Sequence, residues 1–134
     1  LEFEGTWAPT ERFIGRLAFT LQDAEWQDVG NQPPTGILLS EAVAGVSDYV
    51  VTIGADYTLP IGAWGELTLA GDARIQSDFY NTSGHRDLPA NLTDEFTVVN
   101  ARAALTSADR KHQFVLASTN LLGEEAHYIT INFA

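Results

Sequence analysis

Apolar and polar residues alternate along most of the chain with a period of two residues. This is the period of a β-strand, in which successive side chains point to opposite faces. Helical periodicity is scarce. The sequence therefore predicts an all-β fold, an antiparallel up-and-down meander of about six long strands. The expected strands are residues 1–9, 12–23, 46–59, 64–79, 94–106 and 111–134, the last interrupted near Gly123.

The connections between these stretches alternate between short and long. Tight turns are expected at 9–11, 60–63 and 107–110. The segments 24–45 and 80–93 are long and rich in Gly, Pro, Asn and Asp, and the short helical pattern at 37–46 is interpreted as loop. Outer-membrane barrels have short turns on the periplasmic side and long loops outside. The alternation therefore favours a partial transmembrane β-barrel.

Each predicted strand has an uncharged face and a charged face. In the first five strands the apolar positions hold no charge, and the opposite positions hold Glu2, Glu4, Arg16, Asp48, Asp56, Glu66, Asp72, Arg74 and Arg102. A charge that faces lipid at the bilayer midplane costs roughly 2–4 kcal/mol, so a membrane wall would separate charges in this way. A soluble antiparallel sheet with one wet face also alternates.

Two features favour the membrane wall over the soluble sheet. The apolar face holds small residues that would pack thinly as a core: Gly15, Ala55, Gly71, Ala73, Ala101 and Ala103. Aromatic residues gather near strand ends, as in the two interfacial girdles of a barrel. They are Trp7, Phe13, Tyr57 and Trp64 by the tight turns, and Trp26, Tyr49, Phe79, Tyr80 and Phe96 towards the long loops. The alternative that stays open is a small soluble β-barrel that binds an apolar ligand.

Composition narrows the classes of function. The chain has 134 residues, and 18 acidic residues against 7 Lys and Arg give a formal net charge of −11. A nucleic-acid binder needs a basic surface, so no nucleic-acid partner is expected. There is no Cys for a disulfide, and no apolar run of about 18 residues for a transmembrane helix. Leu1 opens directly into the alternating pattern, so we expect the chain to be a piece of a longer protein.

Several segments resemble the C-terminal barrel of TonB-dependent receptors. Residues 1–13 (LEFEGTWAPTERF) resemble the family's E-x-x-x-x-x-x-P-T-x-x-L pattern, and residues 23–26 (DAEW) are similar to its D-A-E-Y. Residues 96–109 resemble Y-T-L-V-N-A-R-L-G-Y-x-S-x-D, and residues 119–128 resemble K-N-L-F-D-E-x-Y. The segments follow the family's order. The chain departs from the family at Gly123, where an acidic residue is usual, and at Ala134, where it stops before a last aromatic-ended strand.

The resemblance implies that residues 1–134 belong to a barrel of about 22 strands, with the plug, the earlier strands and the last strand outside this chain. It implies a location in the bacterial outer membrane, with lipid around the wall. The implied function is active transport of a scarce nutrient, with an iron–siderophore complex as the expected ligand. The TonB energy-coupling complex would act only through the absent plug. No enzymatic activity and no cofactor are implied.

The resemblance also suggests which residues carry function. Loop residues suited to a ligand are Trp26, Asp28, Tyr80, His85 and Arg86. Polar residues expected to face the lumen are Arg16, Asp56, Asp72, Arg74, Asn100 and Arg102. For each single residue, the competing interpretation is a solvated loop residue or ordinary lumen polarity.

Neither a catalytic site nor a metal site is expected. Ser83 and His85 are close in sequence, but a hydrolytic triad needs a nucleophile, a base and a carboxylate in fixed geometry, and a flexible loop is a poor scaffold for it. A zinc site needs three or four convergent ligands. His85, His112 and His127 are far apart along the chain.

Overall fold

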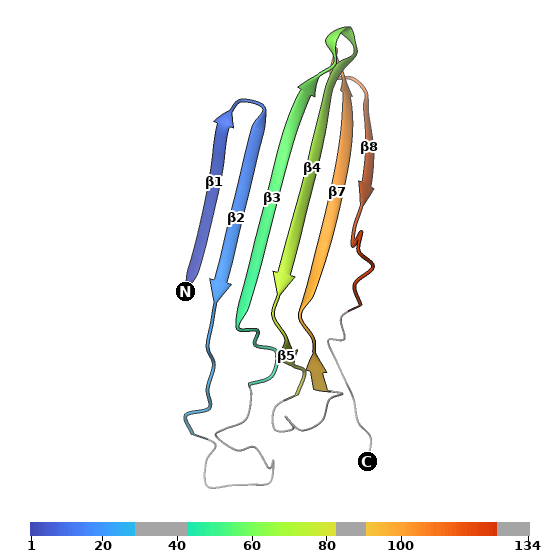
Figure 1. Cartoon of the computed structure of the whole chain (residues 1–134). Helices are drawn as coiled ribbons and strands as arrows, with labels where there is room; N and C mark the ends of the chain where they lie inside the picture. Colours follow the sequence, from blue (N-terminus) through green and yellow to red (C-terminus); the bar gives the residue numbers. More distant parts are fainter. Residues whose placement is uncertain (29–42, 83–90, 126–134) are drawn as a thin grey trace.

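The computed structural model, which describes residues 1–28, 43–82 and 91–125, is all-β (Figure 1). Six strands form one antiparallel sheet in the order β1-β2-β3-β4-β7-β8. They are β1 (Glu2–Thr10), β2 (Phe13–Leu21), β3 (Tyr49–Pro60), β4 (Gly65–Gln76), β7 (Phe96–Ser107) and β8 (Gln113–Ser118). The short strands β5 (Phe79–Tyr80) and β6 (Leu92–Thr93) pair with each other, and η1 (Gly62–Trp64) is a single 3-10 turn. The predicted meander of six strands is confirmed.

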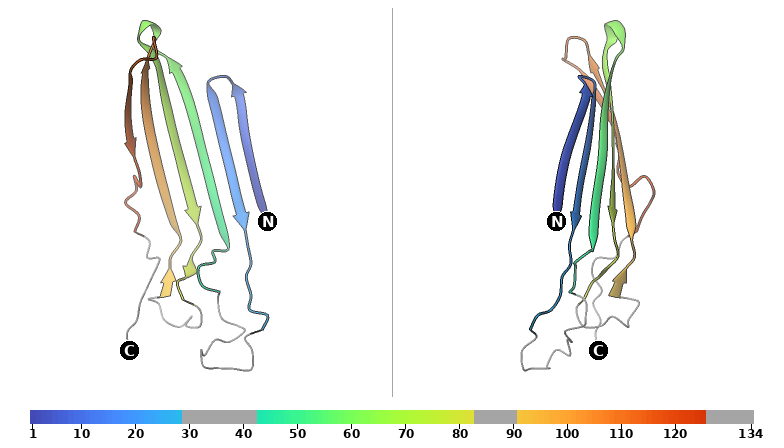
Figure 2. Two further views of the ribbon diagram at one scale, coloured as in Figure 1. Left: turned by 180° about the vertical axis from the view of Figure 1, so that it is seen from behind. Right: turned by 60° about the vertical axis from the view of Figure 1, so that its left-hand side comes forward.

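The six strands form a single open layer. Figure 2 shows the sheet from behind and from the side, with β1 at one edge and β8 at the other. The tight connections β1–β2, β3–β4 and β7–β8 lie together at one end of the sheet. The polypeptide between β2 and β3, and between β4 and β7, leaves the sheet at the opposite end. The predicted sorting of short and long connections therefore holds along the sheet.

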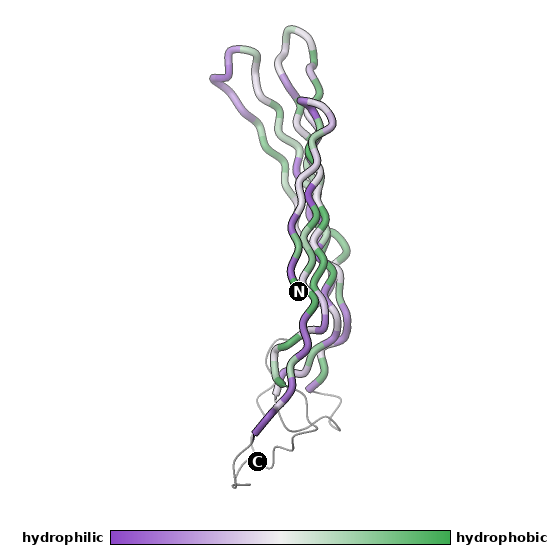
Figure 3. Tube along the Cα trace, turned by 90° about the vertical axis from the view of Figure 1, so that its left-hand side faces the viewer, coloured by the Kyte–Doolittle hydropathy of each residue, from purple (hydrophilic) through white to green (hydrophobic). Residues whose placement is uncertain are grey.

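The pairing register aligns the apolar positions of neighbouring strands on one face. One rung across the sheet runs through Gly5, Leu17, Ile53, Ala73 and Val99, and the next runs through Trp7, Gly15, Ala55, Gly71 and Ala101. Figure 3 shows the resulting alternation of hydrophobic and hydrophilic residues along the strands. Since side chains alternate along a strand, all charged residues within these six strands share the other face. They are Glu2, Glu4, Arg16, Asp56, Glu66, Asp72, Arg74 and Arg102.

Glycine is required in the turn between β3 and β4. Gly65 has a φ of 125°, and a Cβ placed there would lie 2.0 Å from the carbonyl oxygen of Thr106. Gly62, in the same turn, has a φ of 65° and no atom within 4 Å of such a Cβ. The backbone of β7 therefore approaches Gly65 so closely that no side chain fits.

The turn between β7 and β8 is closed by side-chain hydrogen bonds. The Ser107 hydroxyl donates to Asp109 Oδ1 at 2.6 Å, and the backbone N–H of Lys111 donates to the same oxygen at 3.1 Å. These two bonds favour the ionised carboxylate and hold the pKa of Asp109 below its ordinary value. Arg110 adopts a positive φ of 57°.

The strand boundaries differ from the expected ones by three residues or more at three places. The fourth strand ends at Gln76. The next residue, Ser77, still donates its backbone N–H to the Tyr49 carbonyl at 3.1 Å, but its hydroxyl and not its carbonyl lies within hydrogen-bond distance of the Tyr49 N–H, at 3.3 Å, and also accepts the N–H of Asp48 at 2.9 Å. The third strand accordingly begins at Tyr49 and not at residue 46. The last strand ends at Ser118, and Asn120 turns the chain with a φ of 53°.

Parts of the expected pattern fall outside the described residues. The continuation of the last strand at 126–134 and most of the 37–46 segment lie there, while residues 43–46 are not helical. The short β5–β6 pair was not expected, because a strand of two residues is too short to display an alternation of apolar and polar residues.

A small core lies at the loop end of the sheet. Phe79 and Phe96 are only 6% and 4% exposed there, next to buried Ser47, Gln76 and Asn91. The expectation that Phe79 and Phe96 belong to an outward girdle is therefore wrong. Phe96 pairs with Gln76 on the charged face and is buried there.

Candidate functional site

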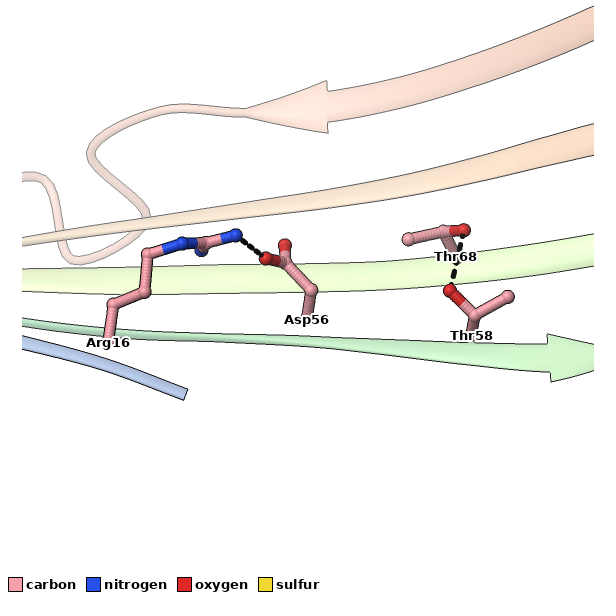
Figure 4. A network of polar contacts seen from close by, with 4 residues as sticks. All are labelled: Arg16, Asp56, Thr58 and Thr68. Atoms are coloured by element: carbon pink, nitrogen blue, oxygen red, sulfur yellow. Dashed lines mark hydrogen bonds and ion pairs between the residues drawn. The ribbon is translucent and has the colours of Figure 1, made fainter. Parts of the chain in front are cut away.

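The charged face carries a network of polar side chains across its central strands. Arg16 of β2 forms an ion pair with Asp56 of β3, and the hydroxyls of Thr58 and Thr68 lie 3.2 Å apart across β3 and β4 (Figure 4). The pairing register creates these contacts, because Arg16 and Asp56 lie on adjacent rungs of neighbouring strands. The Arg16 side chain is 54% exposed and that of Asp56 is 23% exposed, so the pair is open to water.

Asn100 extends this network to the far edge of the sheet. Its Nδ2 donates to Asp72 Oδ2 at 2.7 Å, and its Oδ1 accepts the backbone N–H of Asn120 at 3.1 Å. One side chain of β7 thus contacts β4 and the segment that follows β8. Arg74 donates to Gln76 at 2.8 Å, and Arg102 lies on the same face beside Ala70. The six residues predicted to be lumen-facing therefore share one face.

The opposite face is uncharged and uncovered. Leu17, Ile53 and Leu69, from three adjacent strands, are 39%, 53% and 43% exposed. Between its larger side chains lies an open hollow of about 800 Å³. The hollow follows the small residues of the central rung and is bordered by Phe3, Trp7, Phe13 and Val99. In the described part of the chain, no second layer packs against this face.

Three of the five predicted ligand-contact residues lie at the loop end of the sheet. Trp26 is half-buried and Asp28 is exposed, both in the segment that follows β2, and Tyr80 is half-buried in β5. The carbonyl of Tyr80 accepts the backbone N–H of Gly45 at 2.7 Å, which joins the two loop segments. His85 and Arg86 lie outside the described residues. The ligand role of all five stays a prediction.

A second hollow at the loop end was missed by the sequence interpretation. It measures about 260 Å³ and is lined by three carboxylates, Asp23, Asp48 and Asp78, together with Phe79 and Tyr80. These aspartates are far apart in the chain, so no local motif marks them. Each aspartate lies just outside a strand at the same end of the sheet, after β2, after β4 or before β3. This shared position is the feature of the sequence from which the hollow could have been predicted.

The described residues contain neither a metal centre nor a membrane-spanning helix. Within 1–28, 43–82 and 91–125, no three His, Asp or Glu side chains are grouped so that they could hold a metal ion. Over the same ranges no helix has the length and apolarity needed to cross a bilayer.

Comparisons with known proteins leave the family resemblance as an expectation. No family model, no curated protein and no solved structure matches the chain.

Proposed function

We propose that this chain forms part of the wall of a bacterial outer-membrane β-barrel that imports a scarce nutrient by active transport. One observation carries the proposal: the six strands present a continuous uncharged face that is exposed, and every charge within them lies on the other face. In water such a face would be unfavourable, since large exposed apolar patches are rare on soluble monomers. In contact with the hydrocarbon of a bilayer, the same face is favourable without a second layer of protein over it.

Strand length supports the proposal. β3, β4 and β7 each have 12 residues, or roughly 40 Å at about 3.3 Å per residue. Tilted by about 45°, they would rise by roughly 28 Å, close to the outward apolar band of about 25 Å in outer-membrane barrels. The short turns would then lie on the periplasmic side and the long segments outside.

Site-directed spin labelling tests the membrane wall. The chain has no Cys, so single variants Ile53→Cys and Thr52→Cys place one nitroxide on each face of β3 at the same height. In lipid vesicles we expect the label at 53 to collide preferentially with oxygen and the label at 52 with a water-soluble nickel chelate. Equal accessibility of both labels to the chelate would contradict a lipid-facing wall.

The proposed cargo is an iron–siderophore complex captured at the loop end. The carboxylates Asp23, Asp48 and Asp78 line the hollow there, and their charge favours a neutral or cationic complex over an anionic one. Titration with a ferric hydroxamate siderophore should quench the fluorescence of Trp26 saturably, and the iron-free siderophore serves as the control. The Trp26→Phe variant should lose this quenching, since Trp7 and Trp64 lie in or beside the tight turns at the other end. No saturable quenching in the parent chain would rule out this cargo for the segment.

The alternative is a small soluble β-barrel that binds an apolar ligand. The apolar hollow of about 800 Å³ favours it, because that volume lies in the range of small-molecule sites. In that case the chain stays monomeric and soluble without detergent, and an apolar dye binds with one-to-one stoichiometry. Both spin labels would then report water in the absence of the ligand.

A further inference from the structure

A smaller hollow lies beside the tight turn between β1 and β2. It measures about 460 Å³ and is lined by Thr10, Glu11, Arg12, Phe13 and Tyr57. Phe13 also borders the larger apolar hollow of about 800 Å³, and Tyr57 is its pairing partner on β3. The two hollows thus adjoin at Phe13. Together they are called the turn-side trough below.

The floor of the trough is apolar and consists of small residues from four adjacent strands. They are Gly15, Ala55, Gly71 and Ala101. Trp7 lies at the border and contacts the Phe13 ring edge to face, with the ring centroids 5.6 Å apart. A hydrocarbon chain can approach such a floor closely, because no side chain holds it off and dispersion contacts strengthen at contact distance.

The mouth of the trough carries one acid and one base. Glu11 and Arg12 are adjacent and exposed. Among the residues that the structure describes, neither side chain has an ion-pair partner. The backbone of Arg12 is held from both sides, since its N–H donates to the Thr10 hydroxyl at 3.3 Å and its carbonyl accepts the N–H of Thr58 at 2.8 Å. The two charges therefore have a fixed base and are available to a ligand.

The trough lies at the depth of one lipid leaflet if the uncharged face meets a bilayer. Gly15 follows Arg12 by three residues, or roughly 10 Å of strand. This is less than half of the apolar band of about 25 Å in outer-membrane barrels. Aromatic side chains such as Trp7 and Tyr57 occupy the interface between hydrocarbon and headgroups. Glu11 and Arg12, beyond them, would then lie among the headgroups.

We propose that the turn-side trough binds one phospholipid with a phosphoethanolamine headgroup. An acyl chain lies over the small residues, the Arg12 guanidinium donates to the phosphate, and the Glu11 carboxylate accepts from the primary ammonium. Neighbouring charges of opposite sign match a zwitterion. An anionic headgroup would place a net negative charge beside Glu11, and a phosphocholine headgroup has no ammonium N–H to donate. The proposal rests on the lipid-facing wall of the proposed function and adds a preferred lipid to it.

Brominated lipids test the headgroup preference. In the chain with Trp26→Phe and Trp64→Phe, Trp7 is the remaining tryptophan. The vesicles contain equal parts of phosphoethanolamine, phosphocholine and phosphoglycerol lipids, and one class at a time carries bromine on its acyl chains. From the quenching of Trp7 we expect the phosphoethanolamine lipid to be enriched about threefold over each other class, as an exposed charge pair would give.

The quenching also separates this proposal from the membrane wall. Equal quenching by the three classes would overturn the lipid preference and leave the lipid-facing wall standing. Absence of quenching by every class would place Trp7 outside the lipid and overturn both.

Two charge variants should shift the preference in opposite directions. Glu11→Gln removes the partner of the ammonium and should abolish the enrichment of phosphoethanolamine over phosphoglycerol lipid. Arg12→Gln should increase this enrichment, because Glu11 then repels the net negative phosphoglycerol headgroup without compensation. Lys111→Gln, in the β7–β8 turn at the same end of the sheet, removes a charge outside the trough and is the control. Shifts in the same direction, or an equal shift in the control, would overturn the proposal.

A pair of leucine variants tests the place of the acyl chain. Gly71→Leu fills the floor of the trough, where the nearest atom to a Cβ is the Asn100 carbonyl oxygen at an ordinary 3.5 Å. Ala70→Leu places the same side chain on the opposite face of β4 and is the control. Electron spin resonance of a phosphoethanolamine lipid with a nitroxide on its acyl chain should show a motionally restricted component. We expect this component to be roughly halved in Gly71→Leu, since close contacts are lost, and unchanged in Ala70→Leu. A component that Gly71→Leu leaves unchanged would overturn the proposal.

Discussion

The amide of Asn100 bonds the carboxylate of Asp72 at 2.7 Å on the charged face of the sheet. The same side chain accepts the backbone N–H of Asn120 at 3.1 Å. Asn100 therefore ties β4 to the segment after β8, and its loss would affect three parts of the chain at once.

Asn100→Ala should destabilise the sheet by about 1–3 kcal/mol, because it leaves Asp72 and the Asn120 amide without this partner. Asn100→Asp should cost more, since it adds a second carboxylate beside Asp72. Denaturant unfolding in detergent, followed by tryptophan fluorescence, measures the change. Thr52→Ala, on the same face but at a side chain that forms no such hydrogen bond, is the matched control. Equal stability of the Ala variant and the control would contradict the bridging role.

The ion pair between Arg16 and Asp56 should contribute little. A double-mutant cycle with Arg16→Ala and Asp56→Ala should give a coupling of about 0.2–1 kcal/mol, as found for exposed pairs. Raising the salt from about 0.1 M to 1 M shortens the Debye length from about 10 to 3 Å and should remove most of this coupling. A larger coupling that resists salt would mean that the pair is shielded from water.

Gly65→Ala should destabilise the chain by more than about 2 kcal/mol, because both the φ of 125° and the carbonyl of Thr106 oppose a Cβ. Gly62→Ala is the matched control in the same turn. It should cost only about 1 kcal/mol, the usual penalty for a left-handed non-glycine residue, since no atom lies within 4 Å. Thermal unfolding of both variants makes the comparison. Similar losses would mean that the turn opens to admit a side chain.

Ile53→Arg and Thr52→Arg should differ in lipid. If the uncharged face meets hydrocarbon, the arginine at 53 should cost roughly 2–4 kcal/mol near the midplane, while that at 52 should be nearly neutral. Folding yields into vesicles, measured by heat-modifiable migration, report the difference. Equal yields for the two variants would argue for water on both faces.

Acid should loosen the turn between β7 and β8. The pKa of Asp109 lies below its ordinary value because Ser107 and the Lys111 amide donate to it. Its stabilising contribution is complete above the unfolded value of about 4 and is lost as the pH falls through the lower folded pKa. The protection factor of the Lys111 amide, which is its intrinsic exchange rate at each pH divided by the observed rate, should therefore fall in that window. In Asp109→Asn this protection factor should be low at all pH values, and a protection factor that still changes with pH in this variant would implicate another group.

The face assignments were predictable because the alternation is strong and long. The uncharged positions around Leu17, Ile53 and Leu69 recur at every second residue of their strands. The pairing register places them side by side on one face of the sheet. The end of β4 at Gln76 was not predictable in this way. It coincides with hydrogen bonds from the backbone N–H groups of Asp48 and Tyr49 to the Ser77 hydroxyl, which join residues far apart in the chain.

The same limit applies to the loop end. Phe96 interrupts the alternation of its strand, because it lies on the charged face, and it is only 4% exposed there. Asp23, Asp48 and Asp78 come together only through strand pairing. The alternation with a period of two residues thus predicts that the lumen-facing candidates share one face. The acidic hollow could be found only from the three-dimensional structure.

The rung of Trp7, Gly15, Ala55, Gly71 and Ala101 has a mechanical consequence. Beyond Trp7 its side chains are a methyl group or a hydrogen atom, so few atoms there are pushed together when the sheet flexes towards its uncharged side. We therefore expect resistance to bending to be lowest about the line of this rung. The curvature of the sheet would then adjust there, while the hydrogen-bonded ladders on either side stay intact.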